Sequence, residues 1–117
     1  MYTDKKLQNY VNLILSIVRN SNFDNIEPLF NRIESHFKNG GRIFLVGNGG
    51  SAAVASHAAT DLSKLILNNN KLNTISLNSN ISLVTAVSND EGYENVFSYI
   101  IKNYQVNSKD TLITISS

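Results

Sequence analysis

The fold of this chain is decided by residues 41–64, GRIFLVGNGGSAAVASHAATDLSK. The run Ile43–Val46 has no polar residue, which is typical of a parallel strand covered on both faces. It leads into Gly47–Ser51, and the alanine-rich segment that follows predicts a helix. Glycines let the backbone approach a ligand closely, and the first N–H groups of a helix lack intrahelical partners. The stretch therefore predicts an anion site, and we expect a phosphorylated small molecule to bind there.

The predicted helix after Ser51 carries two rows of side chains. The row expected to face the sheet is Ala55, Ala58, Ala59, Leu62 and Leu65. The adjacent row places His57 and Asp61 one turn apart. Three interpretations of this pair stay open: a surface ion pair, two ligands of a divalent metal, or a general base (Asp61) with an electrostatic partner (His57). Ser51 could cap the helix, contact a phosphate, or do both.

The composition excludes several classes of protein. The 117 residues suffice for one core, with 42% hydrophobic and 16% charged residues. A net charge of +1 gives no sign of a nucleic-acid partner, and the absence of cysteine excludes a disulfide framework. We see no signal peptide and no membrane-spanning stretch, so we expect a cytoplasmic protein with no membrane partner.

The rest of the chain alternates between helical and extended patterns. Apolar residues at helical spacing predict helices over residues 3–20 and 25–38, and the first either covers its own domain or forms an oligomer contact. Beyond the glycine stretch we expect a turn at residues 68–70, strands at 72–77 and 111–115, helices at 81–87 and 93–104, and a polar loop at 88–92. Either Ser79 or Asn80 could cap the helix at 81. The pattern predicts an α/β fold with a parallel sheet. Three strands make too small a parallel sheet for this many helices to cover. We therefore expect an incomplete piece of a larger domain.

A nucleotide cofactor is not expected. The series Gly47-x-Gly49-x-x-Ala52 fits a relaxed dinucleotide fingerprint, but the second strand ends at Asn78 without the carboxylate that holds a ribose. A Walker loop would need a lysine, and Gly50-Ser51-Ala52 has none.

Three segments together resemble the sugar isomerase (SIS) domain family, and within it the phosphoheptose isomerase branch. They are Gly47-Asn48-Gly49-Gly50-Ser51-Ala52-Ala53 with His57, then Asn89-Asp90-Glu91-Gly92-Tyr93-Glu94-Asn95-Val96-Phe97, and Asp110-Thr111-Leu112-Ile113-Thr114-Ile115-Ser116-Ser117. The resemblance spans nearly the whole chain. It implies a flavodoxin-like three-layer fold around a parallel sheet of five strands, preceded by two helices. Residues 1–39 would be helices that pack on the domain and in the contacts of a homotetramer, and residues 40–117 the N-terminal part of the SIS domain.

The resemblance also implies roles for individual residues. The residues around the sugar phosphate would be Asn48, Gly49, Gly50, Ser51, Asn89, Asp90, Ser116 and Ser117. His57 would correspond to a zinc ligand. Asp61 would stand where the branch has a glutamate that is both metal ligand and base. Zinc is thus the one cofactor that the resemblance suggests.

The implied reaction is the conversion of sedoheptulose 7-phosphate to D-glycero-D-manno-heptose 7-phosphate through an enediol(ate). A base moves a proton between the two carbons, and an acid or metal stabilises the oxyanion. Asp61 is shorter than glutamate by one C–C bond, about 1.5 Å, and Glu91 or Glu94 could take its place. The glutamine and histidine that complete the family's site lie outside these 117 residues, so we expect no turnover by these residues alone. The alternative is a non-catalytic SIS module that binds a phosphosugar or a protein partner.

Overall fold

The computed structural model describes residues 4–67 and 70–116, and it separates into two compact units. The first unit is Met1–Asn31 and the second is Arg32–Ser117. The boundary falls inside one helix, α2 (Ile26–Lys38), whose later residues Ile33 and Phe37 pack on the core of the second unit. Each unit is therefore described by itself.

The first unit consists of α1 (Asp4–Asn20) and the start of α2. The spacing of the apolar residues predicted α1, and its bounds agree with that prediction. No residue of α1 is buried within this chain. Its exposed apolar side chains are Leu7, Tyr10, Val11, Leu13, Ile14, Leu15, Ile17 and Val18. The covering role and the oligomer contact both remain predictions for this helix. None of the described helices is both long enough and apolar enough to cross a membrane.

The second unit is built on a parallel sheet, as the sequence predicts. Its strands are β1 (Ile43–Gly47), β4 (Thr74–Ser76) and β5 (Thr111–Ile115), in the order β4–β1–β5. Ile43 pairs with Thr74 on one side and with Thr111 on the other. The first strand in the sequence is thus central, the arrangement of a flavodoxin-like sheet. The strand predicted at residues 72–77 is the shorter β4, Thr74–Ser76. Leu72 and Leu77 lie outside the strand, one on each side, and both are buried.

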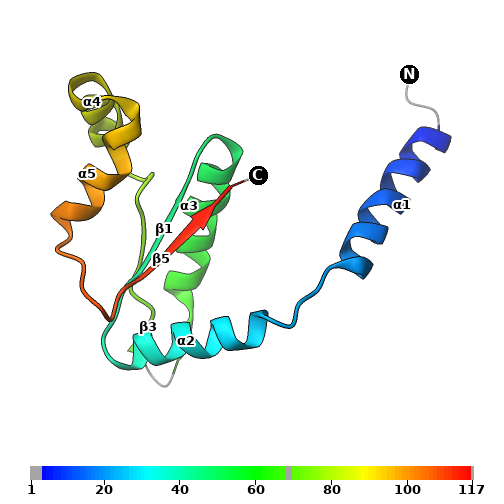
Figure 1. Cartoon of the computed structure of the whole chain (residues 1–117), viewed down its shortest axis with the longest axis horizontal. Coiled ribbons are helices and arrows are strands. Elements are labelled where there is room, and N and C mark those ends of the chain that lie inside the picture. Colours follow the sequence, from blue (N-terminus) through cyan, green and yellow to red (C-terminus); the bar gives the residue numbers. More distant parts are fainter. Residues whose placement is uncertain (1–3, 68–69, 117) are drawn as a thin grey trace. The chain divides into compact units, whose positions relative to one another are not determined.

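Helices cover both faces of this sheet (Figure 1). On one face, α3 (Gly50–Lys64) packs Ala55 and Ala59 against Ile43 and Leu45. On the other face lie α4 (Ile81–Glu91), the 3₁₀ turn η1 (Tyr93–Asn95) and α5 (Val96–Asn103). The buried residues on that face are Phe44, Val46, Leu77, Val87, Val96 and Ile100. The expected three-layer arrangement is therefore confirmed.

The chain between α3 and β4 holds a small feature that the sequence did not predict. It is a two-stranded antiparallel pair, β2 (Ile66–Leu67) and β3 (Asn70–Lys71). The turn predicted at residues 68–70 falls mostly on residues 68–69, outside the described residues. Leu65 was predicted to belong to the row of α3 that faces the sheet, but its side chain is half-exposed. That row therefore ends before Leu65.

The polar loop predicted at residues 88–92 is wrong. Helix α4 continues through Asn89 and Asp90 to Glu91 and ends at Gly92, which has φ +86°. Polar residues on an exposed helical turn resemble a loop in the sequence, whereas the positive φ that glycine tolerates marks the true end. The start of α4 agrees with the prediction, since Oδ1 of Asn80 accepts a hydrogen bond from the N–H of Leu83 (3.0 Å).

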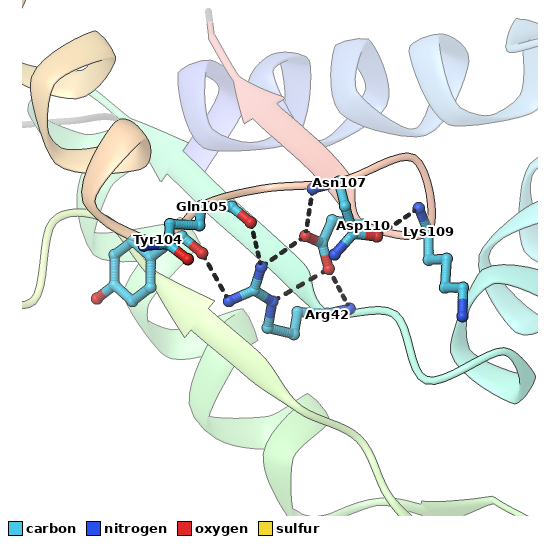
Figure 2. Close-up of polar contacts among 6 residues, drawn as sticks. All are labelled: Arg42, Tyr104, Gln105, Asn107, Lys109 and Asp110. Atoms are coloured by element: carbon cyan, nitrogen blue, oxygen red, sulfur yellow. Dashed lines mark hydrogen bonds and ion pairs between the residues drawn. The ribbon is translucent and has the colours of Figure 1, made fainter.

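An ion pair joins the start of β1 to the start of β5 (Figure 2). The guanidinium of Arg42 donates to both carboxylate oxygens of Asp110, from Nε at 3.1 Å and from Nη2 at 2.7 Å. The backbone N–H groups of Arg42 and Asn107 donate to the same carboxylate. Nη1 of Arg42 also donates to the carbonyl of Tyr104 at 3.0 Å. Because the Asp110 side chain is 5% exposed, this carboxylate is a buried charge whose partners are all in place.

The Arg42–Asp110 pair predicts a specific pH dependence of folding stability. The hydrogen bonds from Arg42, assisted by those from the backbone of Asn107 and Arg42, hold the pKa of Asp110 well below its ordinary value despite its burial. A carboxylate whose pKa is lowered in the folded state adds to the free energy of unfolding above about pH 4. This contribution is lost as the pH falls further. Urea unfolding between pH 7 and pH 2 should therefore show Asp110→Asn less stable than wild type at neutral pH, with a gap that narrows below about pH 4. The exposed Asp24→Asn is the control, and a gap independent of pH would contradict the assignment.

Candidate functional site

The glycine loop, residues 47–51, lies at the carboxyl end of the central strand, where open parallel sheets bind their ligands. Helix α3 begins at Gly50, and its N-cap is Gly49, which has φ +53°. The N–H of Ser51 donates to the carbonyl of Asn48 at 2.9 Å, and the N–H of Ala52 also bonds within the loop. The N–H groups of Gly49 and Gly50 have no protein partner among the described residues. They are the two backbone donors that this helix start offers to an anion.

Ser51 does not cap α3. No side chain makes a capping hydrogen bond at this helix, because the helix already includes Gly50 and places Ser51 in its first turn. Of the two roles left open for its hydroxyl, contact with a phosphate remains a prediction.

Gly47 is required by the close approach of its own loop. A Cβ at this position would lie 2.5 Å from both the carbonyl carbon and the carbonyl oxygen of Ser51. Gly50 differs, since a Cβ there would meet nothing within 4 Å. The close packing of the turn therefore requires a glycine at position 47, whereas position 50 has room for a side chain.

Three strand ends bring polar residues to the same edge of the sheet. Asn48 follows β1, Asn78 lies just beyond β4, and Ser116 follows β5. Gly47 pairs with Ile115, so the two strands are about 4.8 Å apart at the point where Asn48 and Ser116 follow them. The structure thus brings Ser116 beside the glycine loop, as the site prediction requires. Ser117, the other predicted serine, lies outside the described residues.

Two residues of this edge were missed by the sequence reasoning. Asn78 forms reciprocal hydrogen bonds with Gly47: its Nδ2 donates to the carbonyl at 2.8 Å, and its Oδ1 accepts from the N–H at 3.1 Å. Tyr93 donates its hydroxyl hydrogen bond to Oδ1 of Asn48. Asn78 had a usable signal, since an amide directly after a strand lies on the same edge as the loop. Tyr93 was named only as part of a segment that carries the family resemblance and as the first residue of a predicted helix, so its hydroxyl received no role.

Asn89 and Asp90 lie in the last turn of α4, just before Tyr93, and both are exposed. Nδ2 of Asn89 donates to Oδ1 of Asp90 at 2.9 Å. The contact between Tyr93 and Asn48 links this segment to the glycine loop. This contact supports the predicted grouping of Asn89 and Asp90 with the loop, and the grouping itself stays a prediction.

His57 and Asp61 form an ion pair on the exposed side of α3. Nε2 of His57 lies 3.1 Å from Oδ2 of Asp61, and Nζ of Lys64 lies 3.5 Å from Oδ1. The side chains of His57 and Asp61 are 81% and 57% exposed. Asp61 lies 11 residues after Gly50, which is about 16 Å along the helix axis at about 1.5 Å per residue. The two side chains form the surface pair that was one of the three interpretations. The metal-ligand and general-base interpretations stay predictions.

The described residues do not complete a zinc site. Zinc in proteins takes three or four ligands, and His57 and Asp61 would supply two of a suitable type. Within residues 4–67 and 70–116 no three side chains of His, Cys, Asp or Glu gather as a metal site would need. We therefore derive no catalytic step through zinc from these residues.

An open depression of about 530 Å³ lies between α3, β4 and the start of α4, and Asn78 forms part of its lining. Its lining is rich in hydroxyl groups, from Ser56, Thr60, Ser63, Thr74, Ser76 and Ser79. These hydroxyls already bond within the chain, for example Thr74 to the carbonyl of Ala59 at 2.7 Å and Ser79 to that of Ser76 at 2.8 Å. No buried side-chain polar atom among the described residues lacks a partner, so the depression shows no group waiting for a ligand.

A three-layer fold around a parallel sheet, with a glycine loop at the carboxyl end of the central strand, defines an α/β domain of the kind that binds phosphorylated ligands. The profile of the SIS domain matches residues 7–117, and the chain belongs to this family.

Relatives and solved structures agree with this membership. The chain is 44% identical over 81 residues to the phosphoheptose isomerase of Helicobacter pylori (strain ATCC 700392 / 26695), covering 68% of this chain and 42% of that protein. It is 32% identical over 105 residues to phosphoheptose isomerase 2 of Campylobacter jejuni, covering 89% and 48%. The phosphoheptose isomerase GmhA of Neisseria gonorrhoeae superposes with a TM-score of 0.82 at 27% identity, covering 97% of this chain and 60% of that chain. The chain thus spans less than half the length of the Helicobacter and Campylobacter relatives.

The glycine loop predicts opposite outcomes for two matched substitutions. Gly47→Ala forces a methyl group against the backbone of Ser51, so it should lower the free energy of unfolding by about 1–3 kcal/mol. Gly50→Ala meets no neighbour and adds a better helix former in the first turn of α3, so stability should hold or rise by up to about 1 kcal/mol. Urea denaturation of both variants checks the pair. Equal losses would show that close approach at Gly47 does not constrain the loop.

Proposed function

We propose that this chain forms the phosphosugar-binding part of an aldose–ketose isomerase that acts on sedoheptulose 7-phosphate. The observation that carries the proposal is the glycine loop at the carboxyl end of β1, in a chain of the SIS family. Gly49 and Gly50 offer backbone donors, while Asn48, Ser51, Asn89, Asp90 and Ser116 offer side-chain donors and acceptors for phosphate and hydroxyl oxygens. The relatives named phosphoheptose isomerase support the choice of a seven-carbon sugar.

In this proposal Asp61 is the base that moves a proton between the two carbons of the enediol(ate). Both of its carboxylate oxygens already face nitrogen atoms in the structure, Nε2 of His57 and Nζ of Lys64. Exposed ion pairs are worth only about 0–1 kcal/mol, so one of them can open at little cost to let a substrate hydrogen approach. His57 would then stay as the electrostatic partner of the carboxylate. Zinc binding at His57 and Asp61, assembly into a homotetramer and a cytoplasmic location all remain predictions.

One observation favours the alternative, a module that binds the phosphosugar without converting it. A seven-carbon sugar phosphate measures roughly 10 Å from its first carbon to phosphorus, given C–C bonds of about 1.5 Å. With its phosphate at the start of α3, the ligand would reach about as far as His57, which lies about 10 Å along the helix axis. Asp61 of the same chain lies about 16 Å along it. Binding at the loop and chemistry at Asp61 are therefore separable, and one experiment can distinguish them.

The experiment uses the complete protein, because these 117 residues alone are not expected to convert the sugar. It measures both binding of sedoheptulose 7-phosphate by calorimetry and its conversion by NMR. If Asp61 is the base, Asp61→Asn should lower kcat by at least about a hundredfold with little change in Kd. Asp61→Glu restores the length of the family's side chain and should raise kcat, by up to about a hundredfold if reach is limiting. Glu34→Gln is the matched control, because Glu34 forms a similar exposed ion pair with Lys38 at 2.8 Å.

The outcomes divide the two functions. Conversion that survives in Asp61→Asn at the wild-type rate refutes the role of this carboxylate. Binding of the sugar phosphate by the complete wild-type protein without any conversion establishes the binding module. A wild type that neither binds nor converts it refutes both forms of the proposal.

A further inference from the structure

The glycine loop is held from two sides by side chains that come from distant parts of the chain. Asn78, just beyond β4, contacts Gly47 from 31 positions away in the sequence. Tyr93, in η1, contacts Asn48 from 45 positions away. Since the two contacts fall on consecutive residues of the loop, together they restrain both the path of its backbone and the direction of its first polar side chain.

Asn78 acts as a substitute for a neighbouring strand. The backbone ladder between β1 and the β4 segment ends with the N–H of Leu77, which donates to the carbonyl of Leu45 at 2.9 Å. The chain then turns away, and the amide of Asn78 takes over by bonding both the N–H and the C=O of Gly47. A side-chain amide suits this position because it carries a donor and an acceptor side by side. The buried Gly47 is thereby fixed on this side, while β5 pairs with it on the other.

Tyr93 sets the orientation of the Asn48 amide. Its half-exposed ring lies edge-on to Phe97, with ring centroids 6.3 Å apart and planes at 75°. The hydroxyl then donates to Oδ1 of Asn48. With its oxygen engaged, Asn48 presents its Nδ2 hydrogens, which are donors that suit a hydroxyl or phosphate oxygen.

We propose that Asn78 and Tyr93 are positioning residues of the phosphosugar site, which fix Asn48 so that its amide donates to the ligand. The inference rests on the proposed function, because it concerns the same loop and the same ligand. Neither residue needs to touch the sugar. Pre-organisation of this kind raises affinity because the loop and the amide are already ordered before binding.

The test compares Kd for sedoheptulose 7-phosphate, by calorimetry, in two variants and two matched controls. Tyr93→Phe keeps the ring against Phe97 and removes the hydroxyl, and Asn78→Ala removes both hydrogen bonds to Gly47. Each should raise Kd about three- to tenfold, the range expected for the loss of one or two hydrogen bonds. The controls are Tyr99→Phe, a half-exposed tyrosine of α5, and Asn73→Ala, an exposed asparagine at the other end of β4. Both controls should leave Kd unchanged.

A second readout follows the amide itself without any ligand. The side-chain N–H₂ resonances of Asn48 should shift in Tyr93→Phe and stay in place in Tyr99→Phe. Wild-type binding with unchanged Kd in both variants, or unmoved Asn48 resonances in Tyr93→Phe, would overturn the inference while sparing the proposed function. A wild type that does not bind the sugar phosphate would instead defeat the proposed function, and the positioning role with it.

Discussion

The double burial of β1 is the constraint on which the rest of the second unit depends. Phe44 and Val46 point to one layer, and Ile43 and Leu45 point to the other. Removing such side chains from water contributes about 1.5–3 kcal/mol each, and only a strand covered on both faces can bury all four. Because β1 is also paired on both edges, its end has a fixed place. The glycine loop inherits that place, and so does the start of α3.

Local patterns predicted the layers, whereas contacts between distant segments escaped them. The apolar run Ile43–Val46 and the helical spacing around it were enough for the parallel sheet and for the position of the loop. The last turn of α4 was missed because Asn89 and Asp90 read as loop residues when their neighbours in space are unknown. The same reason hid Asn78 and Tyr93, whose partners lie 31 and 45 positions away. Hydrogen bonds of this kind depend on the folded arrangement and have no periodicity to reveal them.

The candidate site divides into an ordered part and an exposed part. The ordered part is the sheet edge, where Gly47 and Asn48 are tied to neighbouring segments and two backbone donors remain available. The exposed part is the row of His57, Asp61 and Lys64, where side chains form weak surface pairs. In the proposed function, affinity and turnover would therefore respond to different substitutions. Under that proposal, binding depends on how well the edge is pre-organised, and chemistry depends on whether the exposed carboxylate of Asp61 reaches the sugar.

The strand order also sets the sequence of events by which the sheet is assembled. The central strand is made first, yet its two partners begin at Thr74 and Thr111, and the Arg42–Asp110 pair joins positions 68 residues apart. Closing so long a loop costs chain entropy before any contact rewards it. During synthesis one edge of β1 therefore stays unpaired until β5, which begins at Thr111, has been made. The ion pair at Asp110, placed just before β5, is the contact available to hold that last strand in register when it arrives.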